Sequence, residues 1–465
     1  MKSVLKFLCL AVVISFLLAA CGQADEEVFN EEFGGIADVK DLEGITVKYY
    51  RRASGADQVL GNEYDTVLGD LALERIRKVQ NDYNCILDIQ YLAAGDPYGT
   101  FNLNNSIGSY FCDIFCGISD MLRQAMKTGA LVGLSTVEDI IDFRNEERWG
   151  GRNMLEPLYW EDEAYGLIPL SWPTASVSYQ GLMIVNEDLI AAVNAEDPRD
   201  LFENKQWTWA TFRNCLEKYY VQEGAEVKQY ALTHQYLGNL GRDYIMSNGY
   251  ILAQKGPDGD YHSGLTDPRV ITAMNEATDL AFGSLSYTIS IDVNLLDVMV
   301  NGQTVLGVLH DSEHISRIVK EMPNFGVLAA PSGPDVEPGY IATTSMNIGN
   351  VTVLSNYSPN IEASAIVLNA LYEPFEEYPD INSVKDFLYH TYFFDRRDAD
   401  IYYDLYMHTQ FSYFASSLWN TLHEWLEGGW GPTEYIDAHI DQVEDYIAKE
   451  VAPSKKGVDA VWGNE

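Results

Sequence analysis

The segment that most constrains the fold is YGLIPLSWPTASVSYQGLMIVN, residues 165–186. It contains Pro169 and Pro173 and ends in the apolar run Gly181–Val185. Proline fixes φ and lacks a backbone donor, so neither proline suits a helix interior or a central strand. We therefore predict an extended passage that leaves one compact unit and enters the first strand of another. About 120 residues of strand and helix pattern precede it, near the usual size of one domain.

Residues 1–20 have the pattern of an export signal. Lys2 and Lys6 give a basic start, and residues 7–20 are uncharged and apolar. This run is shorter than the roughly 20 apolar residues of a spanning helix and has the length of a signal peptide. The sequence LAACG at residues 18–22 resembles the bacterial lipobox. We expect residues 1–20 to be a signal peptide and Cys21 to carry the lipid; an ordinary secretory signal is the alternative.

Residues 21–43 are acidic and lack periodicity, which predicts a lipidated, flexible tether. The remaining chain of about 420 residues is too long for one core and suits two domains. The formal net charge of −39 favours solubility and argues against nucleic acid or anionic lipid as a partner. Two acyl chains give durable anchoring. We expect membrane contact through the lipid only, on the outer face of the bacterial cytoplasmic membrane.

The cysteine pattern does not indicate a disulfide framework. Of six cysteines, Cys9 belongs to the signal peptide and Cys21 to the lipid site. The others are predicted to be small buried hydrophobes; they are Cys85, Cys112, Cys116 and Cys215. A disulfide between Cys85 and either Cys112 or Cys116 is an alternative in an oxidising compartment. The C-x3-C pair lacks a matching zinc half-site, so we expect no metal and no cofactor.

The first lobe has the pattern of parallel strands joined by helices. Residues 45–50, 85–92 and 113–116 are predicted strands, rich in β-branched and aromatic residues. Between the first two, apolar residues recur at helical spacing over 68–83, with Asp65 or Thr66 as N-cap. Strand–helix–strand connections of this length imply parallel pairing and right-handed crossovers.

Polar residues follow the ends of these strands. Arg51 and Arg52 end the first strand, and Ser119 and Asp120 follow the third, at the start of a helix. Ligands of open α/β sheets collect outside the carboxyl ends of the strands, where helix N-termini offer free N–H groups. These four residues are therefore candidate ligand contacts. The alternative is that Ser119 or Asp120 only caps the helix that follows.

The second lobe has clear helix starts. Thr208 is a predicted N-cap between Trp207 at N′ and Phe212 at N4, the spacing of a hydrophobic staple. We therefore expect Trp207 and Trp209 to be structural. Pro268 has the position of the first residue of another helix. Residues 304–309 form a predicted strand.

The segment after that strand is HDSEH, residues 310–314. His310 and His314 would share one face of a helix, as in some metal sites, but Asp311 or Ser312 serves equally well as a helix cap. We expect no metal here and keep Asp311 and Ser312 as candidate ligand contacts. Residues 325–331 form a second extended passage ending in proline, predicted to return the chain to the first lobe.

The chain from residue 386 onward is helical in character and rich in aromatic residues. Trp430 lies in GGWGP, residues 428–432, which is a predicted loop. Exposed aromatic side chains stack on sugars, whereas buried ones belong to the core. The loop position makes Trp430 a candidate ligand contact.

These patterns predict an α/β protein of two lobes joined by crossing strands, with a ligand cleft between the lobes. The predicted bounds are 44–168 with about 332–385 for lobe 1, 174–326 with about 386–465 for lobe 2, and crossings near 165–175 and 325–331.

The mature chain resembles the extracellular solute-binding lipoproteins of ABC importers, of the sugar-binding family 1. The resemblance rests on the lipobox and on motifs in a set order. They are Asp113-Ile114 before a Gly-x-Ser turn, Tyr165-Gly166-x-Ile168-Pro169, Val185-Asn186-Glu-Asp-Leu189, Trp207-Thr208-Trp209, Asn301-Gly302-Gln303 and Phe325-Gly326-Val327…Pro331. These motifs are specific for the family and not for a ligand.

The resemblance implies the type II periplasmic-binding-protein fold, whose lobes close on ligand like a hinged clamp. It implies capture of a small ligand, here expected to be an oligosaccharide, and its delivery to ABC transporter permease subunits. Maltose-type relatives tend to carry a tryptophan where this chain has His310-Asp311-Ser312. Trp172, just past the first crossing, is a candidate platform in its place; packing at the hinge is the alternative.

Other functions stay open on the sequence. A tethered glycoside hydrolase would need two carboxylates at a set separation, but the acidic residues lie mostly on helix faces and in the tether. We therefore expect a monomeric binding protein and no enzyme. Arg51 and Arg52 would suit a peptide carboxylate or an anion, whereas a sugar site prefers aromatic and Asp/Asn side chains. A sensor with the same fold is a further alternative.

Overall fold

The computed structural model describes residues 40–52, 58–92, 97–173, 179–234, 237–250, 253–289, 294–309, 315–341, 343–345, 350–411, 425–426 and 428–463. The predicted signal peptide, Cys21 and residues 22–39 of the predicted tether lie outside these ranges. Among the described residues, no helix is both long enough and apolar enough to cross a membrane.

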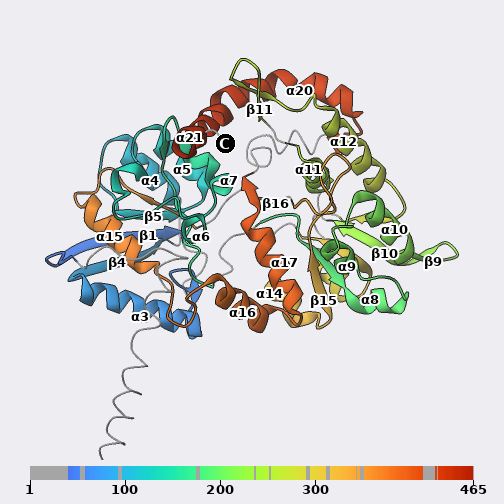
Figure 1. Ribbon diagram of the computed structural model, residues 1–465, viewed down its shortest axis with the longest axis horizontal. Coiled ribbons are helices and arrows are strands. Elements are labelled where there is room, and N and C mark those ends of the chain that lie inside the picture. Colours follow the sequence, from blue (N-terminus) through green and yellow to red (C-terminus); the bar gives the residue numbers. More distant parts are fainter. Residues whose placement is uncertain are drawn as a thin grey trace, which may run out of the picture.

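Two lobes, each built around its own sheet, lie side by side in Figure 1. In the described residues, lobe 1 holds a four-stranded sheet of order β17-β5-β1-β4, and lobe 2 a six-stranded sheet of order β13-β10-β14-β8-β15 with β9 paired to β10. The strands of lobe 1 are β1 (Ile45–Arg52), β4 (Cys85–Leu92), β5 (Ile114–Gly117) and β17 (Val351–Leu354). Those of lobe 2 are β8 (Met183–Asn186), β9 (Val221–Glu223), β10 (Glu226–His234), β13 (Ser286–Thr288), β14 (Thr304–Val308) and β15 (Phe325–Leu328).

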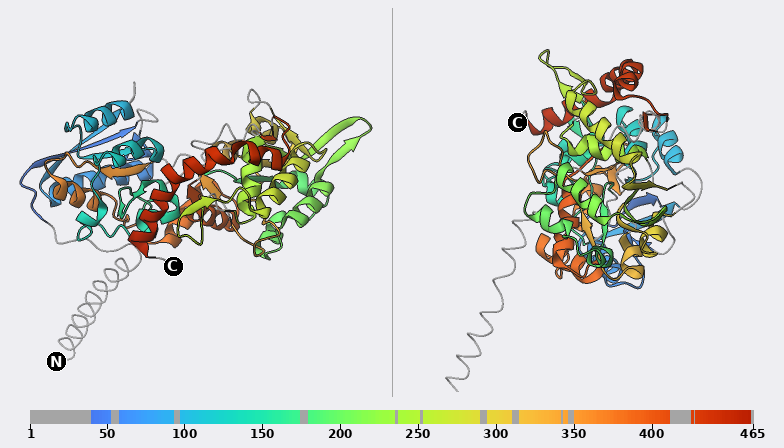
Figure 2. Two further views of the ribbon diagram at one scale, coloured as in Figure 1. Left: turned by 90° about the horizontal axis from the view of Figure 1, so that it is seen from above. Right: turned by 90° about the vertical axis from the view of Figure 1, so that its right-hand side faces the viewer.

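Helices surround both sheets (Figures 1 and 2). The main helices of lobe 1 are α3 (Val67–Asp82), α4 (Pro97–Ser106), α5 (Ser119–Lys127), α6 (Glu146–Trp149), α7 (Arg152–Leu155) and α15 (Ile361–Leu371). Those of lobe 2 are α8 (Glu187–Ala192), α9 (Pro198–Glu203), α10 (Trp209–Tyr219), α11 (Leu237–Ser247), α12 (Pro268–Ala281), α13 (Leu295–Val300), α14 (Ile315–Glu321), α16 (Ile381–Tyr392) and α17 (Arg396–Met407).

Lobe 1 has the parallel strands and the helix cap that the sequence predicts. β1 pairs in parallel with both β4 and β5, so the strand–helix–strand prediction is confirmed. Thr66 caps α3, because its hydroxyl accepts the Gly69 N–H at 3.1 Å. Val47 and Tyr49 of β1 are buried beneath the helices. β17 pairs antiparallel with β5, which returns a distant part of the chain to this sheet.

The helix starts of lobe 2 also follow the sequence. Thr208 caps α10 in a capping box with Thr211. The Trp207 and Phe212 rings lie 5.3 Å apart, edge to face, which confirms the predicted staple. Trp207 and Trp209 are both buried, so their structural role is confirmed. Asp267 caps α12, with Pro268 as its first residue.

Within the described residues, Cys85, Cys112, Cys116 and Cys215 are free, buried thiols, as core packing predicts. Burial raises the pKa of the Cys112 thiol well above its ordinary value. These thiols therefore act as small apolar side chains.

The first crossing leaves lobe 1 through the segment after Leu170. Leu167 and Thr352 exchange backbone hydrogen bonds of 3.0 and 2.7 Å, which fixes the start of the segment to β17 of lobe 1. Beyond the crossing, the Leu309 N–H donates to the Leu182 carbonyl at 2.9 Å in lobe 2. The chain thus changes lobe between residues 170 and 182.

The second crossing differs from the sequence prediction of 325–331. β15 lies at the edge of the lobe 2 sheet, antiparallel to β8. The next residues stay in lobe 2, because the Trp207 indole donates to the Ala329 carbonyl at 2.9 Å and the Ser332 N–H donates to the Trp207 carbonyl at 3.1 Å. The passage to lobe 1 comes later, after β16 (Thr343–Ser345), which pairs in parallel with β18 (Thr409–Phe411).

The C-terminal segment also differs from its predicted place in lobe 2. It consists of α20 (Pro432–Tyr446), a π-helical turn η4 (Ile447–Val451) and α21 (Ala452–Trp462). Figures 1 and 2 show it running from lobe 2 across to lobe 1. α20 packs on α12 of lobe 2, whereas α21 packs on β6 (Tyr159–Trp160) and β7 (Glu163–Ala164) of lobe 1. The local helical pattern gave no indication of this change of lobe.

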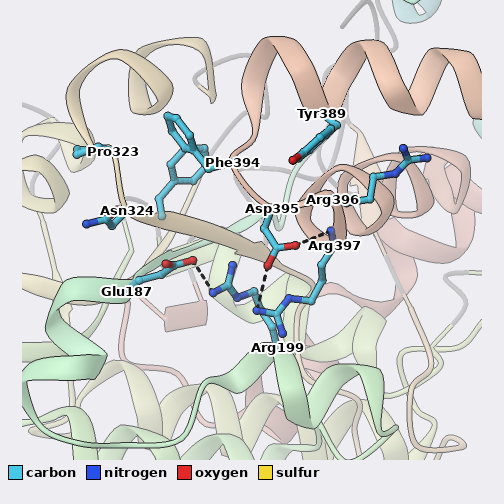
Figure 3. A pocket seen from close by; sticks show the side chains of 10 residues that line it. Glu187, Arg199, Pro323, Asn324, Tyr389, Phe394, Asp395, Arg396 and Arg397 are labelled. Carbon is cyan, nitrogen blue, oxygen red and sulfur yellow. Dashed lines mark hydrogen bonds and ion pairs between the residues drawn. The ribbon is translucent and has the colours of Figure 1, made fainter.

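A buried ion-pair network fixes α9 and α17 on β15. Arg199, 3% exposed, donates to both carboxylate oxygens of Asp398 at 3.1 and 2.9 Å and to Asp197. Asp398, 1% exposed, also accepts the Val327 N–H at 2.9 Å. A Cβ on Gly326 would lie 2.2 Å from the Arg199 guanidinium, so only glycine leaves room for it. Figure 3 shows Arg199 beside Glu187, with Asp395 and Arg397 close by.

Replacement of Asp398 tests this network. Asp398→Asn leaves Arg199 short of one buried counter-charge, so we expect the free energy of unfolding to fall by about 3 kcal/mol. Chemical denaturation measures this change. The matched control is Asp386→Asn, at an exposed pair with Arg396, which we expect to change the free energy of unfolding by less than about 1 kcal/mol. Equal effects of the two variants would contradict the role of the buried pair.

Candidate functional site

The candidate site lies where the carboxyl ends of the parallel strands of both sheets meet the crossings. In lobe 1, β1, β4 and β5 are parallel, and in lobe 2, β10, β13 and β14 are parallel. Ligands of open α/β sheets bind at such ends. The described residues there include the end of β1, the start of α5, the first crossing and the end of β10.

Arg51 is buried at the end of β1 and belongs to a polar network. Its guanidinium donates to the Tyr372 hydroxyl at 3.2 Å and to the Asn350 side-chain oxygen at 3.1 Å. The Tyr372 hydroxyl also lies 2.8 Å from that of Tyr49. Burial raises the pKa of Tyr372 to about 12, so the phenol stays protonated at neutral pH. The network joins β1 to the end of α15 and to the start of β17.

The end of α15 is the anchor of the first crossing. Arg148 donates to one backbone carbonyl there at 2.7 Å, and Arg75 donates to three at 2.7 to 3.2 Å. The Ser171 hydroxyl and the Trp172 indole, both from the crossing, donate to two at 2.5 and 2.7 Å. The acceptors are the carbonyls of Asn369, Ala370, Tyr372, Glu373 and Pro374. Cations here also complement the negative end of the helix dipole.

Trp172 is 2% exposed in this conformation. Its ring stacks on Phe375 at 4.4 Å and lies 5.0 Å from the ring of Tyr372. It therefore lies beside the Arg51 network, with Tyr372 joining the two. In this geometry Trp172 packs at the hinge and presents no ring face to solvent.

Ser119 and Asp120 are the first two residues of α5. The N-cap is Ile118, so the alternative that one of them caps this helix is wrong. Ser119 is fully buried, and its hydroxyl has no hydrogen-bond partner among the described residues. Burial raises the pKa of Asp120, an effect that Arg123 opposes and Glu450 adds to. Asp120 therefore lies near the ion pair that Arg123 of α5 forms with Glu450 of the C-terminal segment.

His234 ends β10 in lobe 2 and is 1% exposed. Its Nε2 atom lies 3.3 Å from the Thr288 hydroxyl of β13, and its Nδ1 atom has no partner among the described residues. Burial lowers the pKa of His234 to about 4, so the ring is neutral at neutral pH. Near the crossing, Arg242 donates to the Gln180 side chain at 2.5 Å and to Asp243 at 2.8 Å.

Among the predicted site residues, the described contacts join Arg51 and Trp172, through Tyr372. No described contact joins the others to this pair. Arg52 is the last residue of β1, and its side chain lies outside the described part of the structure. Asp311 and Ser312 lie outside the described residues, as do His310 and His314. Trp430 is half-buried before α20, with its ring edge-on to His439 at 6.0 Å.

Sequence reasoning missed Tyr372, Asn350 and His234. Tyr372 is the C-cap of α15, a helix whose residues 363–371 are all buried, so its pattern is that of a core residue. Asn350 has a φ of 58°, a left-handed conformation common for asparagine in turns. His234 is the last residue of β10, and its place at the end of a strand is the one sequence signal that could have marked it as a site residue.

Two cavities lined by described residues lie elsewhere on lobe 2. One of about 560 Å³ lies over the Arg199 network, with Tyr389 and Phe394 at its rim (Figure 3). Another of about 520 Å³ lies beside Trp209 and the loop at 332–338. In the described residues, no cluster of three or more His, Cys, Asp or Glu side chains could hold a metal ion.

The solved structures that this chain resembles share its architecture. A sugar transporter from Rhizobium etli in an open conformation matches with a TM-score of 0.64 at 13% identity, over 86% of this chain and 98% of that one. MalE from Xanthomonas citri, a sugar-binding protein, matches with 0.63 at 12%, over 87% and 98%. An ABC substrate-binding protein from Listeria monocytogenes in complex with cycloalternan matches with 0.57 at 14%, over 87% and 99%.

The chain has the type II periplasmic-binding-protein fold. No protein-family model and no curated protein matches the sequence. The likeness spans both lobes and nearly the full length of those structures, so the two-lobed prediction is confirmed. The network of Arg51 and Tyr372 lies beside Trp172 of the first crossing.

His234 makes the stability of lobe 2 depend on pH. Because its pKa falls from about 6.5 when unfolded to about 4 when folded, the unfolded chain binds more protons between these values. The free energy of unfolding should therefore fall as the pH falls through this window, by about 2 kcal/mol between pH 7 and pH 5 for this group. Urea denaturation at both pH values measures it.

His234→Gln should lose this component, so its pH dependence should be about 2 kcal/mol shallower than that of the wild type. His408→Gln, at an exposed histidine, is the matched control and should follow the wild type. Identical pH dependence in wild type and His234→Gln would contradict the assignment.

Proposed function

We propose that the protein is a lipid-anchored, extracellular solute-binding protein of an ABC importer. It captures an oligosaccharide between its lobes and delivers it to permease subunits. The observation that carries the proposal is the two-lobed fold with strand ends of both lobes at the crossings. The likeness to proteins in complex with cycloalternan, maltotetraose and acarbose supports a carbohydrate ligand.

The proposed ligand-binding residues lie on both lobes and at the hinge. They are Arg51, Arg52, Ser119, Asp120, Trp172, Asp311, Ser312 and Trp430. The position of Asp120 at the start of α5 supports a hydrogen bond to a sugar hydroxyl, whereas Arg51 and Trp172 act from beneath by fixing the hinge. The proposal assigns no catalytic residue, no cofactor and no metal. The proposed oligomeric state is a monomer.

Thermal unfolding against a ligand panel tests this function. The protein is the mature chain with Cys21→Ala, so that it carries no lipid, and the panel holds linear and cyclic gluco-oligosaccharides, peptides and anions. A ligand that binds only the folded state stabilises it by ~2.7 kcal/mol at a hundredfold excess over its Kd. We expect an oligosaccharide to raise the midpoint and to be recovered intact.

Three results would contradict parts of the proposal. Cleavage of the sugar would favour a glycoside hydrolase, and a shift with peptides or anions alone would exclude the oligosaccharide. With the bound sugar in hand, Asp120→Asn should weaken binding about tenfold through a lost charged hydrogen bond. Asp70→Asn, an exposed acid in the first turn of α3, is the matched control. Equal affinities of the two variants would remove Asp120 from the site.

The proposed anchor depends on Cys21. In bacteria that express the full chain, we expect the protein in the membrane fraction, labelled by radioactive fatty acid, because two acyl chains hold a protein on a bilayer. Cys21→Ala should abolish labelling and release the mature protein. Cys9→Ala lies in the predicted signal peptide and should change neither. An unlabelled wild type would contradict the lipid anchor.

A further inference from the structure

The C-terminal segment connects the two lobes a second time, away from the crossings. α20 packs on α12 and on β12 (Tyr261–Ser263) of lobe 2, and α21 packs on β6 and β7 of lobe 1. The turn between them, η4, is π-helical, a form that occurs mostly as single turns inside α-helices and is frequent at functional sites. Any rotation of one lobe against the other must therefore bend this segment or break contacts at one of its ends.

The contacts of α21 with lobe 1 are close and partly buried. A Cβ on Gly457 would lie 2.8 Å from the Trp160 backbone nitrogen, so the helix backbone rests directly on β6. The Trp462 indole donates to the Tyr159 hydroxyl at 3.0 Å. Lys455 pairs with Glu156 at 2.9 Å, with only 19% and 13% of their side chains exposed. α21 is thus part of lobe 1.

The turn η4 is fixed to lobe 1 as well. Arg123 of α5, 6% exposed, donates to the Glu450 carboxylate at 2.8 Å and to its backbone carbonyl at 3.0 Å. Lys127 pairs with the same carboxylate. These contacts hold α5, the helix that begins with Ser119 and Asp120, to the C-terminal segment.

The contacts of α21 with lobe 2 are of a different kind. They go to the hairpin of β11 (Ala253–Lys255) and β12, which pair antiparallel. Lys255 and the Tyr261 hydroxyl both bind Asp459 of α21 at 2.8 Å. Lys456 of α21 binds Asp260 of the hairpin at 2.8 Å, with 52% and 66% of these side chains exposed.

The difference in burial decides which end gives way. Exposed ion pairs contribute little and weaken further with salt, whereas close backbone packing and buried charged hydrogen bonds are costly to break. When the lobes rotate, α21 therefore stays with lobe 1, and η4, which also packs on β12, is held there by Arg123 and Lys127. The contacts that break are those of η4 with β12 and those of Asp459 and Lys456 with the hairpin.

We propose that the contact between α21 and the β11–β12 hairpin is an electrostatic latch that sets the relative orientation of the lobes. It holds the orientation seen here and releases as the lobes rotate. Its charges thereby set how readily the cleft changes shape. The link to ligand affinity rests on the proposed function, but the latch itself acts without ligand.

A distance measurement between the lobes tests the latch directly. The mature chain with Cys21→Ala carries probes at Leu103→Cys in lobe 1 and Phe282→Cys in lobe 2, which are 63% and 62% exposed. The native thiols at positions 85, 112, 116 and 215 are buried. Energy transfer between the probes gives the distribution of inter-lobe distances, with no ligand present.

Lys255→Gln with Lys456→Gln removes both cations of the latch. We expect the population of a second inter-lobe distance to rise roughly two- to tenfold, the range that two exposed ion pairs support. Raising the salt from ~0.05 to ~1 M should produce the same change in the wild type, because the screening length falls to about 3 Å. Asp459→Asn removes the anion of the same pair, so by itself it should shift the distribution of inter-lobe distances. Combined with Lys255→Gln, it should add little to the effect of Lys255→Gln.

The matched control is Lys78→Gln, which removes an exposed ion pair with Asp82 inside lobe 1 and should leave the distribution unchanged. Superimposable distributions of the double variant and the wild type at low salt would overturn the latch. A latch response in a protein that binds no sugar would overturn the proposed function and leave the latch standing. Sugar binding without a latch response would overturn the latch and leave the proposed function standing.

Discussion

The structure depends on the carbonyl groups at the end of α15. A helix ends with acceptors that its own backbone cannot satisfy, and here they lie in the interior. Arg75 and Arg148 satisfy four of the carbonyls at residues 369–374. Ser171 of the first crossing satisfies a fifth, and Trp172 shares the Glu373 carbonyl with Arg75. One set of hydrogen bonds therefore completes the core of lobe 1 and fixes the segment that leaves it. The position of the hinge is therefore set by the hydrogen bonds that these buried carbonyls require.

Much of the fold could be predicted because it is encoded locally. The parallel strands of lobe 1, the Thr66 and Thr208 caps and the staple of Trp207 with Phe212 each depend on residues close in the sequence. The fold class followed from the order of such elements. The second crossing could not be placed in this way. An apolar run that ends in proline is typical of a passage between lobes and of an edge strand alike, and only pairing with β8 distinguishes them.

The candidate site was predictable in part. Strand ends identified Arg51, Ser119 and Asp120 as candidates, but not the partner of Arg51, because Tyr372 is 321 residues from Arg51 and caps the end of a helix that is mostly buried and apolar. The C-terminal segment was missed for a related reason. Its helical pattern gives a buried face but not the lobe that covers it, and Glu450 and Asp459 have the pattern of ordinary exposed acids.

The central claim is that ligand bridges two lobes that move about a hinge. Small-angle X-ray scattering of the mature Cys21→Ala chain, without and with a saturating oligosaccharide, tests it most directly. The account predicts a smaller radius of gyration in the presence of sugar, because a ligand held by both lobes favours the closed state. An unchanged radius of gyration at full occupancy would contradict it, since the sugar would then bind without drawing the lobes together.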